Sequence, residues 1–281
     1  LGDVYKRQAK TQTIMDATQV SVGDMRKDIL DLSAASGMAA TDVSEAVYQA
    51  ISGSVATADA ANFVGEANQL AVAGFTSLTN ATDVLTTTLN AYGLEADAVG
   101  GISNVLIQTQ NLGKTSMDEL SASMGKAIST GSAYGVGLTN LSTAYVELTK
   151  GGIATAEATT YISGMLNELG KSSSKVGKII QEKTGKSFGQ LMQDGWSLAD
   201  VLDVLMQSVD GNSEALMQLW SSQEAGKAAN ALAVQGFDDF NHVLAKMERE
   251  MSGATSTTKD AYSVMTDTSC LLYTSPSPRD A

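Results

Sequence analysis

Apolar residues recur at spacings of three and four along almost the whole chain, and glycines close the runs. This is the pattern of amphipathic helices that end in left-handed caps, and strand-like alternation is scarce. One clear stripe consists of Ala60, Phe63, Ala67, Leu70 and Ala71. We therefore predict an all-α fold, with helices at about 24–36, 42–52, 57–73, 81–92, 95–112, 116–130, 139–149, 156–169, 197–209, 213–235 and 237–252.

Serines followed three positions later by an acidic residue support these helix starts. A serine at the cap and a glutamate at the third helical position can satisfy each other's backbone N–H groups in a capping box. Two pairs fit this box, Ser116 with Glu119 and Ser221 with Glu224, and Asp200 after Ser197 is a favourable first-turn acid. These are folding features and not reactive sites.

A weak internal repeat is seen when the glycines that precede a Thr- or Ser-initiated helix are aligned. These glycines are 37 to 39 residues apart, at Gly37, Gly74, Gly113 and Gly152. Each is followed by a helix that ends near another glycine and then by a return helix; the ending glycines are Gly53, Gly93, Gly131 and Gly170. Such periods are typical of stacked helical hairpins. The expected architecture is an array of short helices joined by glycine-rich turns.

The two ends of the chain look foreign to the rest. Residues 1–8 and 270–281 resemble translated sequencing adapters, and we expect the natural protein to extend beyond both. The single cysteine and both prolines fall in 270–281. The remaining sequence therefore has no means of forming a disulfide framework or a thiolate metal site. We divide it into a hairpin-repeat region, 9–185, and a second helical part, 186–269.

The formal charge of −13 argues against binding of a phosphate backbone, and no cluster of Lys and Arg alternates with aromatic residues. No apolar stretch is long enough to cross a bilayer, so we expect no membrane contact by this segment. The charge is typical of a solvated acidic surface.

Residues 183–187 resemble the end of a phosphate-binding loop. That motif needs a glycine five residues before Gly185, where Ile180 stands, and a strand before it, where the pattern predicts a helix. A glycine C-cap followed by a new turn is the favoured interpretation.

Three further groups of residues are candidates for reactive sites. His242 is the only histidine, and one imidazole supports neither a metal centre nor a nucleophilic triad. The carboxylate pairs Asp194 with Asp200 and Glu248 with Glu250 lack the aromatic subsites of a glycosidase, and we expect them on a solvated surface. The sequence thus predicts no catalytic, cofactor-binding or metal site, and no enzyme.

Several ordered stretches resemble the core region of phage tail tape measure proteins. They include Asn-Ala-Tyr-Gly and Leu-Gly-Lys-Thr, and their positions are 24–33, 45–52, 90–93, 112–115, 148–155, 165–170 and 220–226. The resemblance covers nearly all of 9–269. It implies a structural and assembly protein of a phage or prophage tail, in the virion tail and in the host cytoplasm during assembly. It also implies that the long protein sets tail length, templates tube polymerisation and leaves the tube ahead of the genome.

The resemblance implies the tail tube protein, tail assembly chaperones and tail tip proteins as partners, with self-association possible and no cofactor. Short glycine-punctuated helices cannot form one long rod, so we expect a compact module near one end of the ruler. Two alternatives stay open at this stage. One is a helical-repeat protein-binding module unrelated to tails, and the other is a wall hydrolase of the tail tip.

Overall fold

The computed structural model describes residues 10–267, so the adapter-like segments 1–8 and 270–281 lie outside the described residues. All regular secondary structure between residues 10 and 267 is helical, which confirms the all-α prediction. The first helices are α2 (Val22–Ser36), α3 (Ala40–Ser52), α4 (Ala60–Ala73), α5 (Leu78–Tyr92), α6 (Val99–Leu112, after the 3₁₀ turn Ala96–Ala98), α7 (Met117–Ala133), α8 (Leu138–Lys150) and α9 (Thr155–Gly170).

The helices that follow are shorter and less regular in their order. They are α10 (Lys175–Thr184), α11 (Phe188–Gln193), α12 (Leu198–Gln207), α13 (Ser213–Met217), α14 (Gln223–Gln235), α15 (Phe237–Met251) and α16 (Thr257–Thr266). Of these, α10, α11 and α16 were not among the helices predicted above, although the residues before Gly185 had been expected to be helical.

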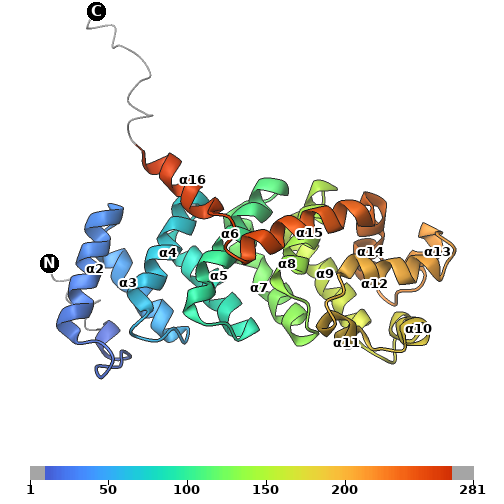
Figure 1. Ribbon diagram of the computed structural model, residues 1–281, viewed down its shortest axis with the longest axis horizontal. Helices are drawn as coiled ribbons and strands as arrows, with labels where there is room; N and C mark the ends of the chain where they lie inside the picture. Colours follow the sequence, from blue (N-terminus) through green and yellow to red (C-terminus); the bar gives the residue numbers. More distant parts are fainter. Residues whose placement is uncertain (1–9, 268–281) are drawn as a thin grey trace, which may run out of the picture.

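The first helices form two rows that advance together along the molecule (Figure 1). In one row α3 contacts α5, α5 contacts α7, and α7 contacts α9; in the other α2, α4, α6 and α8 follow one another. Helix α14 continues the first row by packing on α9. We call α3 to α9 the hairpin array. Its helix pairs bury their apolar faces against their neighbours, as stacked hairpins do.

Helices of the first row begin at similar intervals, at Ala40, Leu78, Met117 and Thr155. Those of the second row begin at Ala60, Val99 and Leu138. These starts are 38 or 39 residues apart. The equivalence of the hairpins as a sequence repeat stays a prediction, because spacing alone does not establish it.

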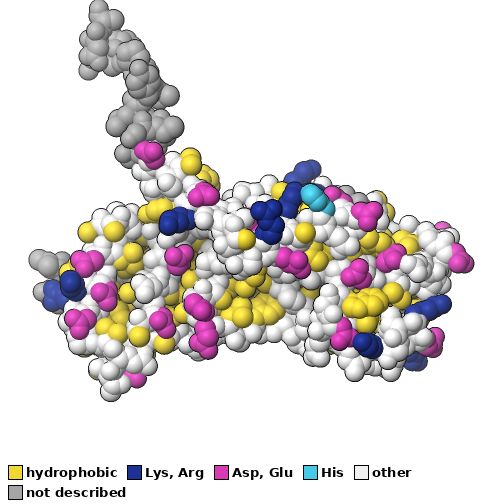
Figure 2. Space-filling view, viewed as in Figure 1, with side chains coloured by type: hydrophobic (Ala, Val, Ile, Leu, Met, Phe, Trp, Pro, Cys, Tyr) yellow, Lys and Arg dark blue, Asp and Glu magenta, His cyan; other side chains and the backbone are white. Residues whose placement is uncertain are grey.

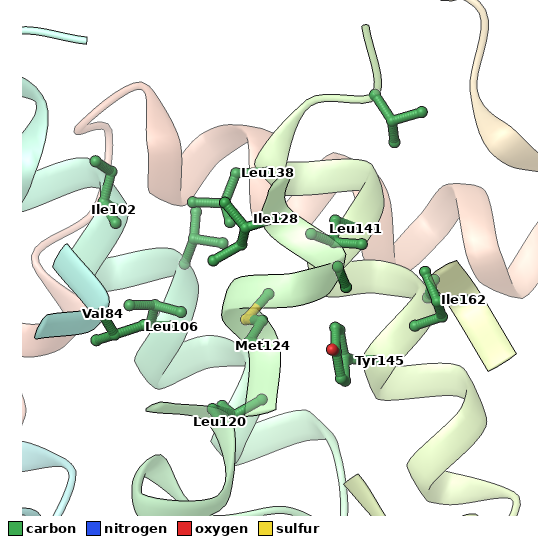
Figure 3. Packing of buried hydrophobic residues seen from close by; sticks show 14 of the residues in the cluster. Val84, Ile102, Leu106, Leu120, Met124, Ile128, Leu138, Leu141, Tyr145 and Ile162 are labelled. Carbon is green, nitrogen blue, oxygen red and sulfur yellow. The ribbon is translucent and has the colours of Figure 1, made fainter. Parts of the chain in front are cut away.

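The core of the array runs between the two rows and is built from aliphatic side chains and methionine (Figure 3). Helices α5 to α9 each contribute to it. The fully buried residues that Figure 3 labels include Leu106, Leu120, Met124, Ile128, Leu141, Tyr145 and Ile162. Alanines and glycines between them let the helices approach closely, so a core with few aromatic residues is still tightly packed.

Several buried threonines of the array satisfy their hydroxyl groups within their own helices. Thr88, Thr109 and Thr149 are buried, and each donates to the carbonyl oxygen four residues earlier at 2.7 Å. A buried hydroxyl without a partner would be costly, and this back-bonding avoids that cost at no expense to the helix ladder.

The C-terminal helices α15 and α16 run back along the array instead of extending it (Figure 1). Helix α15 packs on α8 and α6, and α16 on α6 and α4. We call residues 237–266 the strap. At its centre, Asn104 donates to the carbonyl oxygen of Thr255 at 3.0 Å and accepts from the N–H of Thr258 at 2.9 Å. The backbone of Met251 lies so close to Gly101 that a Cβ there would come within 2.4 Å of its oxygen.

The predicted helix at 213–235 was wrong, because the chain breaks it into α13 and α14. The carboxylate of Glu168, on α9, accepts hydrogen bonds from the backbone N–H groups of Ser221 and Ser222, both at 2.8 Å. The helix cap is Ser222, whose side chain accepts from the N–H of Ala225. The predicted capping box of Ser221 with Glu224 was therefore wrong, and the cap of α14 lies one residue later, at Ser222. The pairs at Ser116 and Ser197 both form capping boxes.

Candidate functional surfaces

The segment that resembles a phosphate loop is a helix end. Helix α10 stops at Thr184, and Gly185 follows with φ 74° and donates its N–H to Gln181 at 2.9 Å. Lys186 forms an ion pair with Asp194 at 2.7 Å. The glycine C-cap predicted for this segment is confirmed, and the lysine is engaged with a carboxylate.

The other candidate reactive residues do not lie together in one site. His242 is exposed on α15, and no group of three or more His, Cys, Asp or Glu residues within 10–267 could hold a metal ion. Asp200 accepts from the N–H of Ser197, as part of the cap of α12. The expectation of a solvated pair at Glu248 and Glu250 was wrong for Glu250, which is 5% exposed and accepts a hydrogen bond from Thr257 at 2.9 Å.

One buried carboxylate sits between the array and the strap. Glu147 on α8 is fully buried and pairs with Lys150 at 3.1 Å, while Lys150 also reaches Asp239 of α15 at 3.7 Å. Burial raises the pKa of Glu147, and the hydrogen bond from Lys150 opposes that shift. Because removal from water disfavours the charged form, the ionised carboxylate of Glu147 lowers the stability of the folded state.

Polar contacts join each hairpin of the array to the next. Tyr92 donates to the carbonyl oxygen of Val136 at 3.1 Å, and Tyr134 donates to Asn167 at 3.2 Å. Burial raises the pKa of Tyr92, which keeps its hydroxyl as a donor. The sequence analysis did not identify these tyrosines as contacts between hairpins.

Charge is distributed unevenly over the surface. An open groove of about 870 Å³ between α2, α4 and the start of α6 is lined by five carboxylates, those of Asp28, Asp31, Asp59, Glu66 and Asp97. At the other end of the molecule, dark blue side chains gather around α10 (Figure 2). The exposed lysines there are Lys171, Lys175, Lys178, Lys183 and Lys186. The molecule thus has an acidic groove near one end and a local cluster of lysines around α10 near the other.

Exposed apolar side chains are few and scattered. The most exposed large ones are Phe75, Val264 and Val234, which lie after α4, on α16 and on α14. Single exposed apolar residues are normal on a protein surface. Phe75 differs from the others because its backbone is also unusual, with φ 54°.

The described helices are too short or too polar to span a membrane. Between residues 10 and 267, none has both the length and the apolar character that crossing a bilayer requires.

Known proteins give this architecture a family. Residues 26–220 match the family model described as phage-related minor tail protein. The chain is also 32% identical, over 269 residues, to a probable tape measure protein of the Clostridium phage phiCD119, and this alignment covers 92% of the chain. It covers 28% of that relative, so the chain spans little more than a quarter of its length. No solved structure matches the chain. Because the family model covers well over half of its residues, the chain belongs to the phage-related minor tail protein family.

Proposed function

We propose that this chain is the folded core of a tape measure protein, a structural part of a phage tail that helps to set tail length and to template the tail tube. Membership of a minor tail protein family supports a structural role in the tail. The observation that carries the finer proposal is the alignment of 92% of the chain with a probable tape measure protein more than three times as long.

The short helices of this segment support different roles for the segment and for the rest of such a protein. The longest helix described here, α7, has 17 residues. At about 1.5 Å per residue it spans only roughly 26 Å, so this array is a poor ruler. We propose that longer helical sequence outside the segment measures length and that the array is a compact module attached to it. Residues 9–185 and 186–269 are proposed as the two parts of this module.

The proposed partners are the tail tube protein, the tail assembly chaperones and the tail tip proteins. Assembly would take place in the host cytoplasm and end in the virion tail, and the protein would leave through the tube ahead of the genome. We propose neither a direct contact with nucleic acid nor one with membrane for this segment, and self-association remains a further proposal.

The proposed role needs no catalysis. Three of the carboxylates considered above have structural contacts: Asp200 caps a helix, Asp194 forms an ion pair and Glu250 holds a strap residue. Incubating the purified chain with peptidoglycan should release no fragments. Release that is lost on substitution of one carboxylate would contradict this part of the proposal.

A deletion in the intact parent gene tests the structural role. Removing residues 10–267 in frame should leave capsids without tails, because tube assembly would lose its scaffold, and expressing the intact gene in trans should restore tails. Electron microscopy of the lysates gives the readout. Normal tails from the deleted strain would exclude the proposed function.

A further inference from the structure

The turn between α4 and α5 holds a large apolar residue in a backbone conformation that favours glycine. Phe75 has φ 54° and its side chain is 78% exposed. Bulky residues rarely adopt positive φ, and such outliers persist where something other than stability retains them.

The turn after α8 shows what the chain does without that constraint. Gly74, Phe75 and Thr76 donate to the residues four, three and five positions earlier, at 2.8, 3.3 and 2.9 Å. Gly151, Gly152 and Ile153 make the same three bonds at 3.1, 2.9 and 3.2 Å. The position of Phe75 is occupied there by Gly152, with φ 90°. Phenylalanine is thus not required by the turn itself.

A pocket of about 340 Å³ opens beside this turn, between the start of α3, the end of α4 and the start of α5. Its apolar lining includes Ala71 and Leu78, both buried, together with Val72 and Met38. Phe75 stands in the chain between two lining residues, Val72 and Thr76. The pocket has room for an apolar side chain, and the exposed Phe75 immediately precedes Thr76 of its lining.

One polar group in the pocket wall has no partner of its own. Asn68 lines the pocket and is 3% exposed, and its side-chain oxygen accepts no hydrogen bond. A buried polar atom without a partner is costly, and because this oxygen is closed to solvent, a partner in the pocket does not reach it unless the Asn68 side chain shifts.

The rim of the pocket is acidic. Asp42 and Glu45 line it, and Asp118 lies at the same turn, where Asn80 donates to it at 3.1 Å. Hydrogen bonds from Thr76 and Asn80 lower the pKa of Asp118, so it is charged at neutral pH. Lys10 pairs with Glu45 at 2.8 Å and offsets one of the three charges. The remaining field favours a cationic partner.

We propose that Phe75 and this pocket form a docking site for a cationic, apolar segment of a partner protein, such as an amphipathic helix bearing lysine or arginine. The partner would place an apolar side chain in the pocket and set its positive groups against Asp42 and Glu45. Phe75 would cover the apolar contact. This inference rests on the proposed function for the partner being a protein, and its test needs no phage.

A second copy of the chain fits the site less well. The basic helix of this protein is α10, whose exposed surface carries the lysines. Its apolar residues Val176 and Ile180 are buried beneath that surface, and Ile179 is partly buried against the core. The helix therefore has no fully exposed apolar side chain to place in the pocket, and we assign the site to a different protein.

Fluorescence anisotropy of a labelled 18-residue leucine–lysine amphipathic peptide, titrated with the purified 281-residue chain at physiological salt, tests the proposal. We expect saturable binding that Phe75→Gly weakens at least tenfold, as loss of an aromatic anchor does. The double variant Asp42→Asn with Glu45→Gln should weaken binding severalfold and flatten its salt dependence.

Two variants elsewhere serve as matched controls. Val264→Ser removes an apolar side chain that is 72% exposed on α16, and Asp28→Asn with Asp31→Asn neutralises two carboxylates of the large acidic groove. Both should leave the affinity within twofold. A peptide with glutamate in place of lysine should not bind. Circular dichroism of every variant establishes that it is folded.

Several results would overturn the proposal. The proposal fails if the unaltered chain does not bind the peptide, or if the folded Phe75→Gly variant binds it as tightly as the unaltered chain does. It also fails if the glutamate peptide binds as tightly as the lysine peptide. Finally, it fails if the groove variant loses as much affinity as the double variant at Asp42 and Glu45. A dimer seen by sedimentation that Phe75→Gly dissociates would assign the site to a second copy. The tail phenotype of the deletion strain is independent of all these outcomes.

Discussion

The hairpin array and the strap are held by contacts of very different range. Within the array, polar contacts between hairpins join residues such as Tyr134 and Asn167, 33 positions apart, or Tyr92 and Val136, 44 positions apart. The strap contacts at Asn104 cross 151 and 154 positions. Each hairpin of the array thus contacts the hairpins next to it in sequence, whereas the strap packs on hairpins that are far from it in sequence.

The difference bears on how cooperative the molecule is. A stack of hairpins that touch only their neighbours can open from one end, because its stability is a sum of local terms. A strap that crosses α8, α6 and α4 links several hairpins, so they should unfold together. Substitutions in the strap contacts should therefore lower cooperativity, and those in the array should act locally.

The largest effect is expected from Gly101→Ala. The added Cβ would meet the Met251 carbonyl oxygen at 2.4 Å, and backbone cannot move aside as a flexible side chain can. We expect a loss of roughly 3 kcal/mol in the free energy of unfolding, typical of severe overpacking. Urea denaturation measures it, and hydrogen exchange should show loss of protection in 252–266.

Gly100→Ala is the matched control, because the nearest atom to its Cβ would be Glu66 Oε2 at 4.0 Å. Replacing a helical glycine by alanine there should stabilise the protein by up to about 1 kcal/mol. Equal behaviour of the two variants would contradict close contact between the strap and α6.

Asn104→Ala should have the next largest effect. It leaves the N–H of Thr258 and the carbonyl oxygen of Thr255 without their partner, at a cost of about 1 to 3 kcal/mol. Asn104→Asp keeps the acceptor but buries a carboxylate against the carbonyl oxygen of Thr255, so in urea denaturation at pH 7 it should be at least as destabilising as Asn104→Ala. An unchanged midpoint for Asn104→Ala would show that the amide does not hold the strap.

Ser116→Ala tests the array alone. It removes the side-chain acceptor of a capping box at the start of α7 and should cost about 1 kcal/mol. Hydrogen exchange should quicken in the first turn of α7 while the strap keeps its protection. Equal loss of protection at α16 would mean that array and strap are not separable in the way described.

Exchanging residues between the two matching turns gives a smaller effect of predictable sign. Phe75→Gly relieves positive-φ strain of about 1 to 3 kcal/mol and adds roughly 1 kcal/mol of backbone entropy cost, so it should stabilise the fold slightly. Gly152→Phe should destabilise it. Thermal denaturation of both variants gives the comparison, and a destabilised Phe75→Gly would show that the side chain supports the fold.

The smallest effect is expected at Glu147, and it depends on pH. Because burial raises its pKa, the folded chain binds this proton more readily than the unfolded chain does. The stability of the unaltered chain relative to Glu147→Gln should therefore rise as pH falls from 7 towards 5. Urea denaturation at both pH values tests this. A difference that is constant, or that changes in the opposite direction, would exclude the account of this group.

The helices of the array and α15 of the strap were largely predictable from sequence, but α16 and the packing of the strap on the array were not. Apolar spacing and terminal glycines are local signals, and they located α5, α7 and α8 to within a few residues. The contact of Asn104 with 255–258 leaves no local trace, and Gly101 reads as an ordinary glycine in a helix. The break between α13 and α14 was missed for the same reason, because Glu168 supplies its cap from α9.

The sequence predicts no reactive site, and this stays a prediction; it gives no sign of the pocket beside the turn after α4. Phe75 carries no signal in the chain that distinguishes it from other turn residues. Its significance depends on a left-handed backbone and a neighbouring cavity, which only the structure provides.

The most direct test of the central claim is tail length in phage that carry in-frame deletions of equal size inside and outside this segment. Removing 39 residues of helical sequence elsewhere in the parent protein should shorten tails by roughly 58 Å, at 1.5 Å per residue. Removing one hairpin, residues 78–116, should instead reduce the number of tails without a matching change in their length. Shortening by the same amount in both strains would contradict the account, because the segment would then act as part of the ruler.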